Sequence, residues 1–188
     1  REIYQKALTS HIEIEDTQKL IIDKLPLNMV KAGLINRLFP ESKLIFALRH
    51  PYDVVLSCFM QNFELNDAMS SFLTLQRSSE LYNVVMNLWV NYNKALDLEV
   101  FEIKYEDLVL DLKSTVEPLL HFLGLSWHDS LMHFQETAIS RDINTPSYNQ
   151  VIQGLYTHSV DRWKNYEDQI VRVAPFLKPW IEEFGYFS

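Results

Sequence analysis

Three basic residues stand where short apolar runs end, and they are the first candidates for chemistry. Lys24 follows the run KLIID, Arg49 follows LIFAL, and Lys104 ends VFEIK. Each run has the length and the apolar or β-branched content of a buried strand. In parallel sheets, ligands bind outside the carboxyl ends of the strands, so the three cations together predict a site for an anion such as phosphate or sulfate. For any one of them alone, a solvated or carboxylate-paired cation is the simpler alternative.

The residues after Arg49 add a hydroxyl that could reach the same anion. Pro51 suits the first turn of a helix, because its missing N–H would have no partner there. On that helix Ser57 falls on the second turn and shares a face with Asp53, four residues earlier. A guanidinium and a hydroxyl could then grip one phosphate from two directions. The alternative for Ser57 is a helix serine that bonds to its own backbone.

Composition restricts the kind of site. The net charge is −8, so a general electrostatic grip on nucleic acid is not expected. The chain has only 4 glycines, from which no G-x-x-x-x-G-K phosphate loop can be built. Cys58 is the single cysteine, which excludes a disulfide within the chain and a thiolate metal cluster. The spacing of His121, His128 and His133 does not fit a metal site, so no metal is predicted.

The elements that must position these residues predict an α/β fold. With 188 residues, 47% of them hydrophobic, the chain can form one domain with a core. Lys19–Asp23, a helix over Leu27–Phe39 and Lys43–Leu48 together have the length of a βαβ crossover, which implies parallel strands. A third strand is expected at Val100–Lys104. We therefore expect three neighbouring parallel strands, with helices on both faces as in a three-layer fold.

The motifs resemble, in order and spacing, those of sulfotransferases that use 3′-phosphoadenosine 5′-phosphosulfate (PAPS). The segment that holds the 3′-phosphate in that family is similar to RHPYDVVLS, and its Tyr-Glu-Asp-Leu segment is similar to KYEDLV. The family's late loop, which closes over the nucleotide, is similar to TPSYNQVIQGLYTHSVDRW. One longer segment is DKLPLNMVKAGLINRLFPESKLIFALRHPYD. It resembles the bacterial branch of the family that is often fused to tetratricopeptide repeats, and more distantly the tyrosylprotein sulfotransferases. The resemblance implies a P-loop-like fold, with PAPS as co-substrate and no metal.

Four residues acquire nucleotide-binding roles from this resemblance. Arg49 and Ser57 would bind the 3′-phosphate, and Tyr105 would lie beside the nucleoside. Arg162 would reach a phosphate of the nucleotide. Trp163, directly after it, is expected to pack in the core.

Two further residues would act on the transferring group. Lys24 matches the lysine that tyrosylprotein sulfotransferases place on the sulfonyl group, where cytosolic members have a histidine base. Ser147 matches a serine that assists the same transition state. The implied reaction is transfer of a sulfonyl group to an acceptor hydroxyl or amine. As in phosphoryl transfer, the protein would mainly position groups and neutralise charge.

The chain also departs from the family pattern. The scarcity of glycine indicates that the 5′-phosphosulfate loop is missing. We therefore expect residues 1–188 to be the C-terminal portion of a sulfotransferase domain, and the activity of this portion alone stays open. Gln61 stands where the tyrosylprotein type has an arginine, and Asp161 replaces a usual glycine. Glu106 and Asp107, at the start of a helix, are expected to complement its dipole.

Two other functions stay open. One is a degenerate nucleotide-binding or protein-interaction domain of the same fold, and the other is a P-loop kinase-like phosphotransferase. For the sulfotransferase, the acceptor could be a small molecule, a glycan or a protein, and its cleft is expected to border the region from Gln61 to Leu96. No apolar run approaches membrane-spanning length, and the expected location is cytoplasmic.

Overall fold

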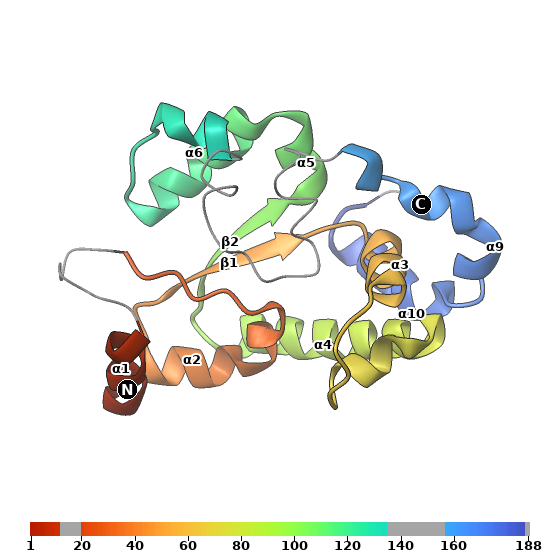
Figure 1. Cartoon of the computed structure of the whole chain (residues 1–188), viewed down its shortest axis with the longest axis horizontal. Helices are drawn as coiled ribbons and strands as arrows, with labels where there is room; N and C mark the ends of the chain where they lie inside the picture. Colours follow the sequence, from red (N-terminus) through yellow and green to blue (C-terminus); the bar gives the residue numbers. More distant parts are fainter. Residues whose placement is uncertain (12–19, 135–156, 187–188) are drawn as a thin grey trace.

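A computed structural model describes residues 1–11, 20–134 and 157–186 of the chain (Figure 1). The order of elements is helical at both ends, with two strands between. They are α1 (Glu2–His11), the 3-10 helix η1 (Pro26–Lys31), α2 (Ala32–Leu38), β1 (Lys43–Leu48), α3 (Pro51–Met60), η2 (Met69–Leu73), α4 (Leu75–Ala95), β2 (Glu99–Lys104), α5 (Tyr105–Leu110), α6 (Leu112–Leu123), η3 (Asp129–His133), η4 (Thr157–Ser159), η5 (Arg162–Tyr166), α9 (Glu167–Ile170) and α10 (Ala174–Glu183).

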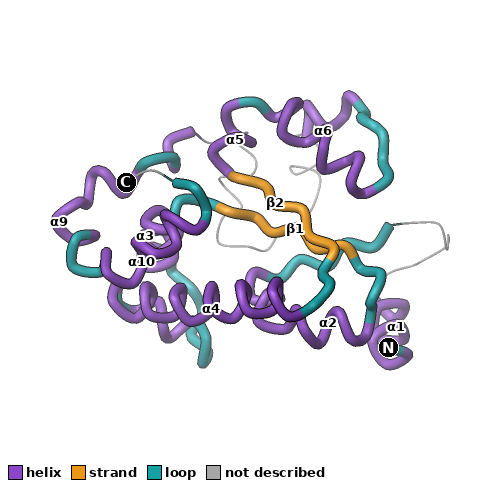
Figure 2. Tube along the Cα trace, turned by 180° about the vertical axis from the view of Figure 1, so that it is seen from behind, coloured by secondary structure: helices purple, strands orange, loops and turns teal. Residues whose placement is uncertain are grey.

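The two strands form a parallel pair, which confirms the α/β class and two of the predicted strands. Their register joins Lys43 to Glu99 at one end and Leu48 to Lys104 at the other. The chain travels from β1 to β2 through α3, η2 and α4, as a parallel connection requires. Figure 2 shows the two strands side by side and ending at the same edge. The residues that follow them therefore meet at that edge.

The first predicted strand is wrong in the part of Lys19–Asp23 that the structure describes. Leu20–Asp23 is an irregular segment, and Lys19 lies outside the described residues. The exposed fractions of Leu20, Ile21 and Ile22 are 53%, 51% and 72%. A strand persists through hydrogen bonds to a neighbour and through a covered face, and this segment has neither among the described residues. Over the described ranges the sheet thus has two strands rather than three, and helices pack against it.

The core lies between the sheet, the long helix α4 and the C-terminal helix α10. Phe46 of β1 is buried and its ring centroid lies 4.5 Å from that of Trp89 on α4. Leu177 and Trp180 of α10 are buried in the same cluster. The buried apolar side chains of α4 thus lie on one stripe, and its exposed positions are mostly polar, with Val84 as a large apolar exception. Across the described ranges, no helix has the length and apolar character needed to span a bilayer.

The turn from β1 into α3 forms as its sequence predicts. Pro51 occupies the first turn of α3, and the His50 ring caps the helix by accepting a hydrogen bond from the N–H of Tyr52 at 3.3 Å. Pro51, Tyr52 and Asp53 are all buried there. The core side chains Val55 and Leu56 follow on the next turn, 1% and 2% exposed, and fix the helix against the rest of the molecule. Arg49 is thereby held at the junction of a strand end and a helix start.

Candidate functional site

Arg49 and Tyr105 meet at the edge where β1 and β2 end. Arg49 directly follows β1, and Tyr105 directly follows β2 as the first residue of α5. Since the register pairs Leu48 with Lys104, the two residues are level with each other. The guanidinium carbon of Arg49 lies 5.1 Å from the centroid of the Tyr105 ring, in cation–π contact. The structure thus brings together two of the residues predicted to bind one nucleotide.

Two more elements hold the Arg49 side chain. Its Nη2 donates a hydrogen bond to the backbone carbonyl of Ser159, and the same Nη2 lies 3.9 Å from Oδ2 of Asp53. The Arg49 side chain is 20% exposed, whereas that of Asp53 is 0% exposed. The Nε of Arg49 is buried, and no acceptor for it is present among the described residues. The guanidinium is therefore fixed in place, with its Nε–H left unsatisfied by the described residues.

Asp53 connects the start of α3 to the late part of the chain. Its Oδ1 accepts a hydrogen bond of 2.9 Å from the backbone N–H of Trp163. Burial raises the pKa of the Asp53 carboxyl above its usual value, while the Trp163 N–H and the Arg49 charge oppose that rise. Asp53 consequently fixes the backbone near Arg49 and also places a carboxylate beside any anion bound there.

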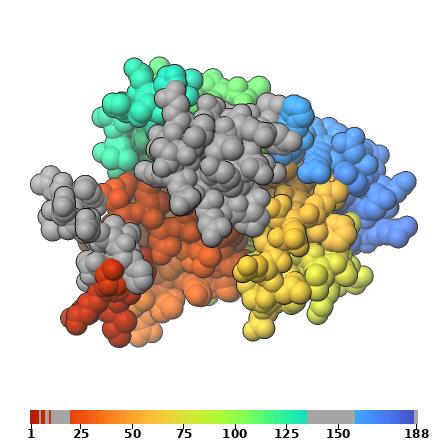
Figure 3. All heavy atoms as spheres, in the orientation of Figure 1, coloured from red at the N-terminus to blue at the C-terminus, as the bar shows by residue number. Residues whose placement is uncertain are grey.

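We call Arg49, Asp53, Tyr105, Ser159 and Trp163 the Arg49 edge. The Trp163 ring stacks on His50, with ring centroids 5.3 Å apart and planes at 17°, and it meets Tyr52 edge-on. It packs against the core cluster, which confirms the packing role expected for it. In Figure 3 the yellow region around α3 and η2 lies beside the blue C-terminal elements at the surface.

The backbone just before Trp163 explains one departure from the family pattern. Asp161 has a left-handed conformation, with φ 57° and ψ 19°, and is the one non-glycine residue with positive φ in the described ranges. Glycine adopts this conformation freely, and aspartate is among the few other residues that tolerate it. The Asp161 carboxylate also pairs with Lys164 at 2.7 Å. A position where the family usually has glycine thus keeps the backbone shape that glycine allows.

Ser57 and Arg162 lie next to the Arg49 edge without belonging to it. Ser57 is half-buried on α3, one turn beyond Asp53 and, by helical spacing, on the same face. Burial raises the pKa of the neighbouring Cys58 thiol to about 11, and the charge of Arg49 acts against that rise, so the field of Arg49 reaches this turn. Arg162 begins η5 beside Trp163, with an exposed side chain.

Lys24 lies in a different environment. Its side chain is exposed, and it follows the irregular segment Leu20–Asp23. The carboxylate of Asp23 accepts hydrogen bonds from the Tyr4 hydroxyl at 2.8 Å and from the Asn28 side-chain amide at 3.3 Å. These contacts tie the segment to α1 and η1 rather than to the Arg49 edge. Ser147, the other predicted catalytic residue, lies outside the described residues.

The sequence did not indicate the contacts of one residue in this region. Glu106, expected only to complement a helix dipole, accepts a 2.8 Å hydrogen bond from the backbone N–H of His50 through Oε1. Its Oε2 accepts a 3.0 Å bond from the hydroxyl of Tyr186. The partners are 56 and 80 residues away in sequence, so no local pattern could indicate them. The only available signal was its place directly after Tyr105.

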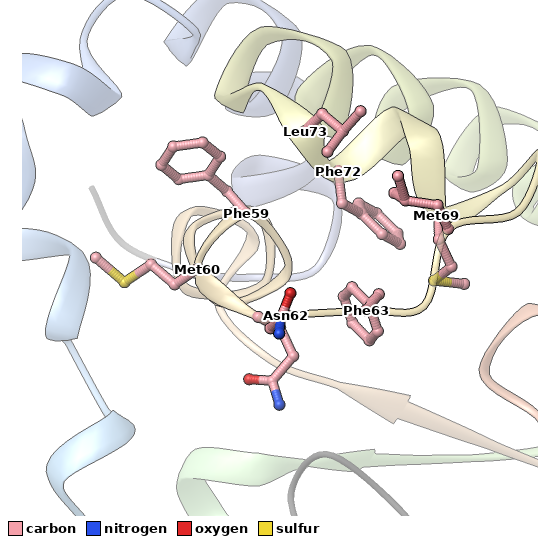
Figure 4. Close-up of a pocket in the computed structure, with 9 residues that line it drawn as sticks. Phe59, Met60, Asn62, Phe63, Met69, Phe72 and Leu73 are labelled. Carbon is pink, nitrogen blue, oxygen red and sulfur yellow. The ribbon is translucent and has the colours of Figure 1, made fainter.

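A pocket of about 370 Å³ opens at the other end of α3 (Figure 4). It is lined by uncharged side chains from the end of α3, the following loop and η2: Phe59, Met60, Gln61, Asn62, Phe63, Leu65, Met69, Phe72 and Leu73. Phe63 and Phe72 pack on each other with ring centroids 5.3 Å apart. Seven of its nine lining residues belong to the region from Gln61 to Leu96, which was expected to border an acceptor cleft. Over the described ranges, no cluster of three or more His, Cys, Asp or Glu side chains could hold a metal ion.

Comparison with known protein families decides the family. The sequence profile of the sulfotransferase family matches residues 1–129, well over half of the chain. The chain belongs to the sulfotransferase family. The matched range includes Lys24, Arg49, Ser57 and Tyr105, and it ends before Ser147 and Arg162. Membership implies the P-loop-like fold of that family.

The sulfotransferase chain also resembles curated proteins over most of its length. It is 29% identical over 167 residues to an uncharacterized protein of Aquifex aeolicus (strain VF5), covering 88% of this chain and 22% of that protein. It is 22% identical over 182 residues to protein-tyrosine sulfotransferase 2 of Gallus gallus, covering 89% and 47%. It is 23% identical over 175 residues to the protein-tyrosine sulfotransferase of Drosophila melanogaster, covering 88% and 34%. The chain thus spans less than half the length of each of these relatives.

Proposed function

We propose that this chain is part of an enzyme that transfers the sulfonyl group of PAPS to an acceptor hydroxyl or amine, with the 3′-phosphate held at the Arg49 edge. Family membership supports the reaction. The observation that carries the assignment of the site is the Arg49 guanidinium itself. It ends β1 at the start of α3, faces the Tyr105 ring and keeps a buried Nε–H without an acceptor among the described residues.

The chemistry of the edge fits a phosphate group. The start of α3 lies beside Arg49, and the dipole of a helix favours an anion near its N-terminal end. The Nε1 of Trp163 is a second buried donor for which the described residues provide no acceptor. Phosphate oxygens are acceptors only, so they would satisfy donors of this kind. The Asp53 carboxylate opposes the anion, and Arg49 must therefore offset its charge.

We propose the remaining nucleotide contacts for three residues. Ser57 would reach the 3′-phosphate from the second turn of α3, on the face that Asp53 shares. Tyr105 would lie beside the nucleoside, with its ring already placed against Arg49. Arg162 would approach a phosphate from the exposed start of η5. We propose these roles because all three residues belong to elements that border the Arg49 edge.

Lys24 and Ser147 are proposed to act on the transferring group. PAPS supplies the sulfonyl group when it is bound, and the departing phosphate oxygen gains negative charge during transfer. An ammonium placed near that oxygen would lower the barrier more than it would strengthen binding. The exposure of Lys24 leaves its side chain able to reorient toward a bound nucleotide. The finer placement in the branch associated with tetratricopeptide repeats is also a proposal, and it rests on the motif resemblance.

The test uses the full-length protein and two ligands that differ by one group. Calorimetry would measure binding of 3′-phosphoadenosine 5′-phosphate (PAP) and of adenosine 5′-phosphate (AMP), which lacks the 3′-phosphate. PAP should bind at least about tenfold more tightly, because charge-assisted contacts to the 3′-phosphate are added. Radiolabelled PAPS should then lose its label to an acceptor or, slowly, to water.

Other outcomes would identify the alternatives. Tight binding of PAP with no release of label would indicate a degenerate nucleotide-binding domain. Magnesium-dependent phosphoryl transfer from ATP, with no preference for PAP, would indicate the kinase-like enzyme. Equal affinities for PAP and AMP would show that the Arg49 edge does not bind the 3′-phosphate.

A further inference from the structure

The Glu106 carboxylate joins three parts of the chain that are distant in sequence. It belongs to the first turn of α5, directly after Tyr105. One oxygen holds the backbone N–H of His50, the residue directly after Arg49, and the other holds the hydroxyl of Tyr186, beyond α10. A single side chain thus fixes the end of β1, the start of α5 and the C-terminal segment relative to one another.

The backbone after α10 places the Tyr186 hydroxyl next to the Glu106 carboxylate. Gly185 has a left-handed conformation with φ 64°, which reverses the chain after α10. The N–H of Tyr186 then bonds to the carbonyl of Ile181 at 2.8 Å. Lys104, the last residue of β2, lies with its Nζ 4.6 Å from the Tyr186 ring centroid and donates to the carbonyl of Gly185 at 3.4 Å. The ring of Tyr186 also meets the ring of His50 edge-on, with centroids 5.2 Å apart.

From these contacts we infer that Glu106, oriented by Tyr186, is a positioning residue that sets the distance and angle between Arg49 and Tyr105. The inference rests on the proposed nucleotide site. Arg49 and Tyr105 belong to separate strand ends, and their cation–π contact requires a stable relative placement of the two backbones. Glu106 supplies it, because its acceptor oxygens reach the residue next to Arg49 while its own backbone is next to Tyr105.

The charge of Glu106 makes this connection stronger than a neutral one. Hydrogen bonds to an ionised carboxylate are roughly twice as strong as those between neutral groups. Burial first, and then the nearby Glu106 charge, raise the pKa of Tyr186, so its hydroxyl remains a donor at physiological pH. Glutamine at this position would keep one acceptor oxygen and present an NH₂ group to the other donor.

The first test compares Glu106→Gln and Tyr186→Phe with two matched controls in the full-length protein. Glu99→Gln removes a carboxylate from the opposite end of β2, and Tyr92→Phe removes a tyrosine hydroxyl bond on α4. We expect Glu106→Gln to weaken PAP binding about tenfold and AMP binding less than about threefold. Tyr186→Phe should weaken PAP binding by about threefold, and adding it to Glu106→Gln should change little, because both act through one connection. The controls should leave both affinities unchanged.

The second test needs no ligand. In protein carrying ¹⁵N-labelled arginine, the Nε–H resonance of Arg49, assigned through its loss in Arg49→Lys, should be shifted by the ring current of Tyr105. Glu106→Gln should move it toward the position of a solvent-exposed arginine, and Tyr186→Phe should move it part of the way. Glu99→Gln and Tyr92→Phe should leave it in place.

The two tests separate this inference from the proposed function. If Glu106→Gln lowers the urea midpoint but alters neither the ratio of PAP to AMP affinity nor the Arg49 resonance, Glu106 is merely structural and the inference is wrong. If the wild-type protein binds neither nucleotide, the proposed function fails, while the resonance still decides the role of Glu106. If Glu106→Gln does not fold, Tyr186→Phe carries both readouts, and an unmoved resonance in that variant would overturn the inference.

Discussion

The Arg49 edge and the segment before Lys24 begin from the same sequence pattern and end in opposite environments. In both, a short apolar run leads into a cation. Arg49 follows a strand with a partner, and its side chain is 20% exposed and held by α3, α5 and the late segment. Lys24 follows an irregular segment in which Ile22 is 72% exposed. One cation is fixed before any ligand arrives, and the other is not.

The difference shows what a cation at the end of an apolar run requires to become a site. The run must first pair with another strand, because the pairing sets where the following residue points. β1 has β2 beside it, delivered by the crossover through α4. Leu20–Asp23 has no such neighbour among the described residues, so its side chains stay uncovered. In the proposed function, nucleotide affinity would therefore depend on the Arg49 edge, and we expect Lys24 to act on rate.

The largest contrast should appear in folding stability. Leu56 of α3 is 2% exposed, and Leu56→Ala should lower the free energy of unfolding by ~2–5 kcal/mol, because it removes buried methyl groups and leaves a cavity. Ile22→Ala should change it by less than about 0.5 kcal/mol, because that side chain already faces water. Urea denaturation of the two variants measures both values. Equal losses would mean that residues 20–25 are packed in solution, and the contrast between the regions would disappear.

The next effect concerns binding. Arg49→Ala should weaken PAP binding by ~2–4 kcal/mol, because a charge-assisted contact in a partly desolvated site is lost. AMP binding should change little. Arg77→Ala, which removes an exposed arginine near the start of α4, is the matched control. Calorimetry that shows equal losses for PAP and AMP would assign Arg49 to folding rather than to the 3′-phosphate.

Lys24 should show the complementary behaviour. Lys24→Met in the full-length protein should lower kcat by ~10²–10³, while nucleotide affinity changes less than about tenfold, because a cation near the transferring group acts mainly in the transition state. Lys24→Arg should restore only part of the rate, since a planar fork replaces a compact ammonium poorly. Lys31→Met, an exposed lysine on η1, is the control. A Lys24→Met enzyme as fast as wild type would place the catalytic cation elsewhere.

The sequence predicted the elements whose signals are local. The structure contains the predicted strands Val100–Lys104 and Leu44–Leu48 and the predicted helix that begins at Pro51. Their signals, an apolar run or a proline at a first helical turn, lie within a few residues of sequence. The same local reasoning failed for Leu20–Asp23, because its shorter apolar run finds no partner among the described residues. Strand formation is decided by neighbours that the run itself does not contain.

The parts of the site that depend on distant partners could not be predicted. Asp53 holds the N–H of Trp163, which is 110 residues away, and Glu106 holds Tyr186, which is 80 residues away. The sequence identified Arg49 and Tyr105 as residues of one site, through strand ends and resemblance. It placed Asp53 on the helix after Arg49, but it did not indicate that this carboxylate would be buried. That carboxylate leads to the smallest effect we predict.

Asp53→Asn tests whether the Asp53 carboxylate orients Arg49 for a bound phosphate or competes with that phosphate for Arg49. The amide oxygen can still accept the Trp163 N–H, while the negative charge 3.9 Å from the guanidinium is removed. A bound phosphate would then meet less repulsion, and we expect PAP affinity to rise by about fivefold, or ~1 kcal/mol, at an effective dielectric typical of such sites. The exposed Asp67→Asn is the control. If Asp53→Asn weakens PAP binding instead, the carboxylate is needed to orient Arg49.

The dependence of stability on pH tests the same carboxylate without a ligand. Burial raises the pKa of Asp53 above its usual 3.8, so the folded protein holds this proton more tightly than the unfolded chain does. As pH rises above 3.8, the unfolded chain releases the Asp53 proton before the folded protein does. The stability of the wild-type protein therefore falls with rising pH until the pH has passed the pKa of Asp53 in the folded state. The amide introduced by Asp53→Asn cannot ionise, so the stability of this variant relative to wild type should increase from acidic to neutral pH and then level off. Urea denaturation across that range measures it. If the difference in unfolding free energy between variant and wild type stays constant with pH, Arg49 and the Trp163 N–H fully offset the cost of burying the Asp53 charge. The carboxylate would then not destabilise the Arg49 edge.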